Sequence, residues 1–397
     1  MIAPTPFFSD RGCHVRILGE LQALKKLGHE VLLCTYHIGK DIDGVVIKRI
    51  FNIPWYKKVK AGPSYHKYYL DLLLMWKVFS AALKFKPDIF HAHLHEGAFI
   101  GLWQHKLFHA PLVFDLQGSL TDEIVDHKFT SPDKLQFRLL RQLEHWINNK
   151  ADAVITSSTK TAESVHKNFK VPKSNIWPVL DGVDAAMFKP AIKNEELLRQ
   201  YTIPRNKIIL LYLGLLDVYQ GTDLLLEAIV ALRNRRSDFH ALIAGYPNED
   251  FYRQKAHEFD IGDCVTFTGR IDYSLASKVI GLGDIAVSPK ISLTEGNQKI
   301  CNYMACALPV VAFDSPVNRE ILKDLGVYAT IGDANSLADS LEYLIKNASL
   351  RRRLGRESRK RVQQQLSWEH SAQRIVKIYD QLTVDLSTTN KPADLQK

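Results

Sequence analysis

The chain has 397 residues, of which 46% are hydrophobic and 24% are charged, and its formal net charge is +9. These values are ordinary for globular proteins and exclude wholesale disorder, and at roughly 150 residues per domain the length predicts two or three domains. The sequence holds no apolar run near the roughly 18 residues that cross a bilayer, and its first residues lack the features of a signal peptide. We therefore expect a cytoplasmic protein, either soluble or peripheral on the inner face of a membrane.

The cysteines are scattered along the chain and form no CxxC pair. An odd number of thiols at irregular spacings is not the pattern of a disulfide framework or of a cysteine-rich zinc site. We expect reduced thiols, as in other cytoplasmic proteins. They belong to Cys13, Cys34, Cys264, Cys301 and Cys306.

Positive charge is concentrated at 57–60 and at 351–361. A basic surface serves nucleic acid, anionic lipid or a phosphorylated substrate. Nucleic acid is not predicted as a partner, because the sequence has no basic stripe interleaved with aromatic residues and no known binding motif. The first cluster, with Lys57, Lys58 and Lys60, precedes the aromatic and aliphatic segment 68–76. Two interpretations of this region stay open: an ordinary packed helix, and a surface that lies on an anionic bilayer.

Short apolar runs alternate with longer amphipathic stretches. The runs are continuous and rich in β-branched residues, as expected of strands buried on both faces. The stretches 15–27, 223–232 and 367–382 each place apolar residues on one helical stripe. This alternation predicts parallel α/β sheets. In chain order, the predicted strands are a brief one within 1–3, then 31–34, 88–91, 112–114, 153–156, 208–213, 241–244, 265–267, 285–287 and 309–312.

The series of strands and helices starts a second time after a polar region at about 184–205. We therefore predict two doubly wound domains. Their predicted bounds are 1–185 and 186–366, followed by a helix over 367–384 and a flexible polar tail over 385–397. The tail is polar, which is typical of chain ends that fray.

Polar residues follow the predicted strands of the first domain, at the sheet edge where open α/β folds bind ligands. Gly12 opens the first helix, whose free N–H groups would face a phosphate. His91, His93 and His95 alternate and are expected on the same face of a strand. Such histidines more often form structural hydrogen bonds than bind zinc, so no metal site is predicted. His95 and Glu96, nearest the strand end, are the better candidates for substrate contact.

A polar, glycine-containing loop follows the next strand at 115–123. Polar side chains at this edge can orient a sugar or a phosphate. The alternative is a capped helix start, with Ser119 or Thr121 as the N-cap residue.

The second domain carries the densest set of candidate residues. Residues 213–221 predict a strand, a loop with a glycine at each end and a helix, a shape that cradles phosphate through backbone amides. Residues 288–299 lead into a further helix, whose first N–H groups would point at a docked ligand. These N–H groups belong to Gly296, Asn297 and Gln298.

Three charged side chains flank that helix start. Lys290 and Lys299 would neutralise a diphosphate, and Glu295 would accept hydrogen bonds from sugar hydroxyls. The simpler alternatives are helix capping by Glu295 and solvated surface lysines.

The chain from Pro4 to about Leu382 resembles a retaining glycosyltransferase of family 4, the group 1 type. Each motif alone is weak, but their order and spacing across two α/β domains are specific. The motifs are Gly28-His29-Glu30-Val31, Asp88-Ile89-Phe90-His91-Ala92-His93, Asp181-Gly182-Val183-Asp184 with Phe188, Leu213-Gly214, Phe267-Thr268-Gly269-Arg270, Tyr303-Met304-Ala305-Cys306-Ala307-Leu308-Pro309-Val310-Val311 and Ser367-Trp368-Glu369.

The resemblance implies the GT-B fold: two Rossmann-like doubly wound domains facing a cleft, with a C-terminal helix crossing back to the N-terminal domain. It implies that the second domain binds a UDP- or GDP-linked sugar and the first holds a lipid-linked or glycan acceptor. A hexosyl group would be transferred with retention, without a metal or other cofactor. With this resemblance, the candidate donor-binding residues are Gly12, Gly214, Arg270, Lys290, Glu295, Gly296, Asn297, Gln298, Lys299 and Asn302, and the candidate catalytic residues are Glu295, Lys290, His95 and Gln117.

The donor site departs from the family pattern at three positions. Asn302 stands where the second glutamate is usual, and it forms hydrogen bonds but carries no charge. Leu215 and Gln220 stand where the family has the arginine and lysine that bind the diphosphate. We therefore predict that Lys290 and Lys299 replace those cations.

The acceptor side departs at one position, where Gln117 stands in place of the usual histidine. His95 or Asp115 would then assist catalysis. Two functions stay open: an active glycosyltransferase, and a catalytically weak or inactive GT-B subunit that binds a donor. Hydrolysis or transfer of a donor sugar by the purified protein, compared with its Glu295→Ala variant, separates them.

Overall fold

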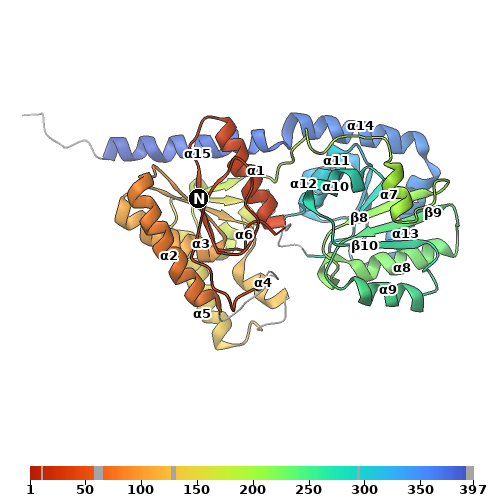
Figure 1. The fold of residues 1–397 in the computed structure, drawn as a ribbon, viewed down its shortest axis with the longest axis horizontal. Helices are drawn as coiled ribbons and strands as arrows, with labels where there is room; N and C mark the ends of the chain where they lie inside the picture. The colour runs from red at the N-terminus through yellow and green to blue at the C-terminus, as the bar shows by residue number, and fades with distance from the viewer. Residues whose placement is uncertain (10–11, 58–65, 127–130, 293–295, 390–397) are drawn as a thin grey trace, which may run out of the picture. The chain divides into compact units, whose positions relative to one another are not determined.

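The computed structural model describes the chain except for residues 10–11, 58–65, 127–130, 293–295 and 390–397. The chain forms two compact units (Figure 1). The first consists mainly of residues 1–180 and 368–397, and the second mainly of 181–293 and 297–367. Every helix in the described part of the chain is too short or too polar to cross a bilayer.

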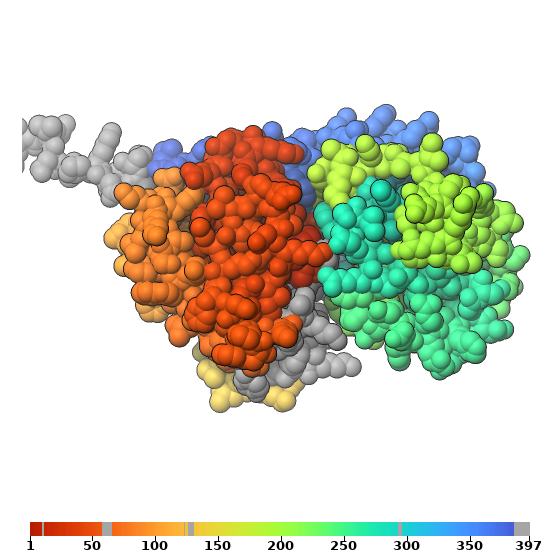
Figure 2. All heavy atoms as spheres, in the orientation of Figure 1, coloured from red at the N-terminus to blue at the C-terminus, as the bar shows by residue number. Residues whose placement is uncertain are grey.

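The first unit is built on a seven-stranded parallel sheet in the order β3-β2-β1-β4-β5-β6-β7. Its strands are β1 (Ile2–Ala3), β2 (Leu32–Thr35), β3 (Val46–Arg49), β4 (Phe90–His93), β5 (Leu112–Leu116), β6 (Ala153–Thr156) and β7 (Ile176–Pro178). Its helices are α1 (Gly12–Lys26), α2 (His66–Phe85), α3 (Leu94–Phe108), α4 (Leu120–Asp126), α5 (Leu135–Lys150), α6 (Thr159–Phe169) and α15 (Trp368–Thr389). Figure 2 shows residues of α2, in orange, on the outer surface of this unit.

Helices cover both faces of this sheet. Successive side chains of β4 point to opposite faces, so they enter two different environments. Ala92 belongs to the apolar core that α2 and α3 share with β5. Side chains at odd positions point to the opposite face, where α1 and α15 pack together. The parallel register sets His91 beside Val113 and His93 beside Asp115. A buried polar layer therefore forms under α1 and α15.

The second unit is built on a six-stranded parallel sheet in the order β10-β9-β8-β11-β12-β13. Its strands are β8 (Ile208–Leu213), β9 (Phe239–Ala244), β10 (Val265–Gly269), β11 (Ile285–Ser288), β12 (Val310–Phe313) and β13 (Gly326–Ala329). Its helices are α7 (Glu195–Gln200), α8 (Thr222–Arg233), α9 (Glu249–Glu258), α10 (Tyr273–Ile280), α11 (Gln298–Ala305), α12 (Pro316–Leu322), α13 (Ala334–Lys346) and α14 (Ala348–Gln365). Strands β8, β9, β11 and β12 are buried almost throughout, which accounts for their apolar sequences.

The expected α/β class with two parallel sheets is confirmed, and each predicted strand overlaps an observed one. Three further strands, β3, β7 and β13, lie at sheet edges and carry half-exposed residues, so their sequences lack an apolar run. The last helix, α15, extends to Thr389, past the predicted end at 384. All five cysteines are free thiols, as predicted.

The expectation that three alternating histidines share one strand face is wrong for His95. Strand β4 ends at His93, and Leu94 adopts a left-handed backbone conformation with φ 62°. The chain turns there into α3, so His95 belongs to a helix.

Candidate functional site

The N-terminus of α11 is fixed to the end of β11 by a buried asparagine. The side-chain nitrogen of Asn297 donates to Ser288 Oγ at 2.9 Å and to Asn318 Oδ1 at 2.8 Å. Because its amide points inward to Ser288 and Asn318, Asn297 positions the helix start. The next residue, Gln298, begins α11 and donates through Nε2 to the carbonyl of Gly182 at 3.3 Å.

Three other predicted residues lie close to this helix start in the sequence. Gly296 directly precedes Asn297 and is half-buried, whereas Glu295 lies outside the described residues. Lys290 follows β11 after one intervening residue and is only 5% exposed. The alternative interpretation, that Lys290 is a solvated surface lysine, is therefore wrong.

Lys299 reaches from α11 to the loop after β8. Its Nζ donates to Gln220 Oε1 at 2.7 Å and to the hydroxyl of Tyr212 at 3.3 Å. It also lies 4.6 Å from the centre of the Tyr212 ring. The Tyr212 hydroxyl in turn donates to the carbonyl of Leu215 at 2.6 Å. The ammonium group is thus connected to both positions, Leu215 and Gln220, that lack the expected cation.

The two glycine-containing loops of the second unit are packed against each other. The amide of Ile291 donates to the carbonyl of Tyr219 at 3.1 Å. Gly221 has φ 76°, and a Cβ atom there would overlap the carbonyl oxygen of Pro289, so this close approach requires glycine. Lys290, next to Pro289, is therefore brought to the loop that Lys299 contacts.

The remaining donor-site candidates differ in how close they lie to Lys299. A Cβ atom built on Gly214 would lie 2.7 Å from Lys299 Nζ, so this glycine directly adjoins the ammonium. Asn302 is on α11, and its Oδ1 is shielded from solvent with no hydrogen-bond partner in the described residues. Arg270 is exposed after β10, where its guanidinium lies 5.1 Å from the centre of the Tyr246 ring.

In the first unit, His95 is buried against Glu144. Its Nε2 lies 3.4 Å from Glu144 Oε1, and its ring meets that of Phe114 edge-on. Burial would raise the pKa of Glu144, but hydrogen bonds and charge from His95, with further hydrogen bonds from Thr121, lower it to about 2. His95 is therefore a buried side chain held beside a carboxylate.

Gln117 and Gly12 occupy different positions in the same unit. Gln117 follows β5 and donates through Nε2 to Asp115 Oδ2 at 3.1 Å. Gly12 is exposed at the first position of α1, and a Cβ atom there would meet nothing within 4 Å.

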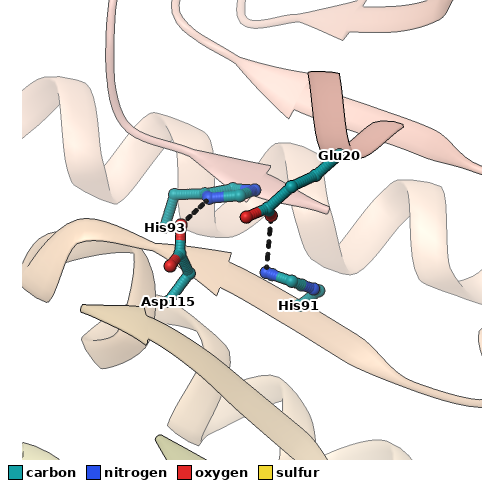
Figure 3. A group of neighbouring side chains, drawn as sticks. All are labelled: Glu20, His91, His93 and Asp115. Carbon is teal, nitrogen blue, oxygen red and sulfur yellow. Dashed lines mark hydrogen bonds and ion pairs between the residues drawn. The ribbon is translucent and has the colours of Figure 1, made fainter. Parts of the chain in front are cut away.

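A buried charged cluster lies behind Gln117, between the sheet and α1 (Figure 3). Arg16 donates two hydrogen bonds to Asp115, from Nε to Oδ2 at 3.0 Å and from Nη2 to Oδ1 at 2.8 Å. The same Nη2 atom lies 3.0 Å from Glu20 Oε1. Burial would raise the pKa of Asp115, but Arg16 and His93 hold it well below its usual range. Asp115 is thus a buried carboxyl group that accepts hydrogen bonds from both Arg16 and His93.

The fold built from these two sheets is the GT-B fold of glycosyltransferases. The chain is similar to sucrose-phosphate synthase from Thermosynechococcus elongatus, with a TM-score of 0.79 at 19% identity, covering 97% of this chain and 98% of that one. It is also similar to Anabaena Alr3699/HepE in a complex with UDP and glucose, with a TM-score of 0.76 at 15% identity over 96% and 98% of the two chains.

Sequence comparison defines the family. Residues 11–186 match the model of Glycosyltransferase Family 4, and residues 193–361 match the model of Glycosyl transferases group 1. The chain therefore belongs to the group 1 glycosyltransferases of family 4. Its relatives include Sulfoquinovosyl transferase SQD2 of Arabidopsis thaliana, 24% identical over 90% of this chain and 68% of the relative. They also include the phosphatidyl-myo-inositol mannosyltransferase of Mycolicibacterium smegmatis, 23% identical over 96% and 92% of the chains.

Sequence reasoning missed several residues that shape these sites. Tyr212 lies within an apolar strand and gives no local sign that its hydroxyl bridges Lys299 and Leu215. Arg16 and Glu20 occupy one stripe of α1 and are both buried, although charged residues at that spacing usually face solvent. Only the three-dimensional structure brings them to Asp115.

Proposed function

We propose that this glycosyltransferase moves a hexosyl group from a nucleotide-diphosphate sugar to its acceptor with retention of configuration, without a metal in the reaction. The observation that carries the proposal is the position of the Lys299 ammonium, 2.7 Å from Gln220 and adjoining Gly214. The family's usual diphosphate cations are absent from the loop after β8. Lys299, which is on α11, supplies one positive charge to that loop.

Departure of the sugar leaves negative charge on the diphosphate. Fixed donors aimed at that charge accelerate the step because they need no reorganisation when it develops. Lys299 and Lys290 provide the cations, and the first N–H groups of α11 provide hydrogen-bond donors with the positive end of the helix dipole. Asn297, anchored to Ser288 and Asn318, holds these N–H groups in place. Glu295 would bind the sugar hydroxyls.

A uridine nucleotide is the first donor to test. UDP and UDP-glucose are bound by the Anabaena protein of similar fold. The purified chain should release UDP from a UDP-sugar, or GDP from a GDP-sugar, faster than its Glu295→Ala variant does. Nuclear magnetic resonance of a transfer product reports the anomeric configuration, and added magnesium or manganese should leave the rate unchanged.

A donor-binding subunit without activity would give a different result. It would bind UDP with the same affinity before and after Glu295→Ala, and it would release no nucleotide from any UDP- or GDP-sugar, with or without lipid acceptors. That pattern would contradict the proposed reaction. Inversion of the anomeric centre would contradict the proposed stereochemistry alone.

For the acceptor, we propose a lipid-linked or glycan substrate reached from an anionic membrane surface. Three neighbouring helices expose apolar stripes with a spacing of four residues. On α2, Tyr68, Leu72 and Trp76 are 78%, 65% and 69% exposed. On α3 the stripe is Trp103 and Leu107, and on α5 it is Leu135, Leu139 and Leu143.

Ring contacts connect these stripes into one surface. Trp76 meets Phe79, and Phe79 meets Phe108 of α3, with ring centres 5.4 Å and 5.9 Å apart. Phe99 of α3 meets Trp146 of α5 at 6.3 Å. Exposed apolar surface of this extent is unusual for a protein surrounded by water only. Exposed cations border it, among them Lys84, Lys106, Lys134 and Arg138.

Flotation with liposomes that contain anionic lipid tests the membrane proposal. The wild-type chain should float with them, and Leu72→Gln/Trp76→Gln should remain below. Phe251→Gln is the matched control, because Phe251 is a 60% exposed aromatic residue on α9. Lys57→Glu/Lys58→Glu/Lys60→Glu should also release the protein; of these three, Lys58 and Lys60 lie outside the described residues. Equal flotation of the wild-type and variant chains, or no flotation of the wild type, would refute the membrane proposal.

A further inference from the structure

Four side chains that can bind a metal ion meet in the core of the first unit. They are Glu20 of α1, His91 and His93 of β4, and Asp115 of β5 (Figure 3). One ligand atom from each lies within 4.8 Å of the others, and none of the four side chains is more than 2% exposed. Figure 3 shows the carboxylate of Glu20 between the two imidazole rings.

The hydrogen bond from His93 fixes which of its nitrogens carries the proton. Its Nδ1 lies 2.9 Å from Asp115 Oδ2, and an ionised Asp115 can only accept. Nδ1 therefore donates. In the neutral ring with this proton, Nε2 presents a bare lone pair. This Nε2 is buried and has no hydrogen-bond partner in the described structure.

His91 repeats the arrangement with a different outer partner. Its Nδ1 shares a hydrogen bond of 2.6 Å with the hydroxyl of Tyr379, on α15. Its Nε2 lies 3.5 Å from Glu20 Oε2 and forms no hydrogen bond within the described residues. Histidines that bind metals usually have their second nitrogen held by such an outer group. Both histidines therefore have one ring nitrogen held by an outer group and the other without a hydrogen bond in the described residues, which is the orientation of metal ligands.

The charge of the cluster is also suited to a cation. One guanidinium, that of Arg16, faces the carboxylates of both Glu20 and Asp115. Two carboxyl groups thus share one guanidinium, and a bound cation would be a second positive partner for them.

We propose that Glu20, His91 and His93 form a zinc site of the first unit, with Asp115 and Tyr379 as the outer partners of the two histidines. Neutral imidazole nitrogens and carboxylate oxygens are ligands that zinc accepts, at distances of about 2.0–2.2 Å. Asp115 is not a direct ligand, because it binds His93 Nδ1 on the side of the ring away from Nε2. The ion would join α1 to β4 beneath α15, and it plays no part in the proposed glycosyl transfer.

Metal content of the untagged full-length chain tests the proposal. The protein is dialysed against a chelator, incubated with zinc chloride, desalted and analysed by mass spectrometry for zinc. The wild type should retain about one zinc ion per chain, and loading with cobalt should give the visible absorption of a four-coordinate site. Competition with a zinc-binding dye should show an affinity at least about tenfold weaker in Glu20→Gln and in His91→Gln. His257→Gln, which changes an exposed histidine of α9, should bind zinc like the wild type.

Two results would overturn the proposal. If the wild type retains no zinc after loading, the cluster is not a zinc site. If Glu20→Gln and His91→Gln both retain zinc with unchanged affinity, the ion binds elsewhere. Circular dichroism establishes which variants are folded, and the wild-type measurement decides the proposal even if neither variant folds.

Discussion

Arg16 of α1 and Asp115 of β5 form a two-pronged ion pair in the core of the first unit. Both side chains are almost fully buried, although the residues are 99 positions apart in the sequence. The guanidinium also donates to the carbonyl of Val179 at 3.2 Å. This pair links the first helix to the centre of the sheet and to the segment after β7.

Removing the charge of Asp115 should be strongly destabilising. In Asp115→Asn the Arg16 guanidinium loses a buried counter-ion, and the free energy of unfolding should fall by about 3–5 kcal/mol. Denaturation with urea measures it. Asp314→Asn is the control, because Asp314 binds Arg319 with the same two-pronged geometry at the surface and should change stability far less. Similar losses in the two variants would contradict the role assigned to the buried pair.

The contact between α1 and α15 depends on a glycine. A Cβ atom on Gly19 would overlap the indole of Trp368 at the start of α15. Gly19→Ala should therefore lower the free energy of unfolding by about 2–3 kcal/mol, as overpacked cores do. Gly12→Ala, in the same helix, meets no atom and should change stability by less than about 1 kcal/mol. Thermal unfolding of both variants checks this, and a neutral Gly19→Ala would show that α15 can move aside.

Asp71 of α2 should make stability depend on pH. Burial, with the negative charge of Glu96, raises the pKa of Asp71 to about 7. The folded protein therefore holds this proton more tightly than the unfolded chain does. Its stabilising contribution is complete below about pH 4 and is lost as the pH rises through 7.

The Asp71→Asn variant isolates this effect, since asparagine still accepts the hydrogen bond from Tyr36. Between pH 4 and pH 8 the free energy of unfolding of the wild type should fall by about 1–2 kcal/mol relative to that of the variant. This value is smaller than the full pKa shift would give, because Asp71 is partly exposed and solvent screens its charge. Urea unfolding at several pH values gives the two curves. Parallel curves would show that Asp71 titrates normally.

The sequence predicted the elements that are buried on both faces better than those at the edges. Strands such as β8 and β9 are continuous apolar runs because helices cover both sides. β3 alternates between exposed and half-buried residues, and β7 ends in a proline, so neither shows the pattern of a buried strand. Helix α15 continues past its predicted end with largely polar residues.

The candidate donor site was predicted in its residue types but not in its contacts. Lys299 and Gln220 are 79 positions apart, and their hydrogen bond depends on how α11 packs beside β8. The inward turn of the Asn297 side chain depends on Ser288 and Asn318 in the same way. Local patterns report periodicity and helix starts. They carry no information on which two distant side chains meet.

The central claim, that lysines from around α11 replace the missing diphosphate cations, is tested most directly by calorimetric titration with UDP and GDP. Lys299→Ala and Lys290→Ala should each weaken binding of the preferred nucleotide by about tenfold or more, because each removes a charge-assisted contact to phosphate. Lys278→Ala, an exposed lysine on α10, should leave the affinity unchanged. Unchanged affinity in both Lys299→Ala and Lys290→Ala would contradict the account.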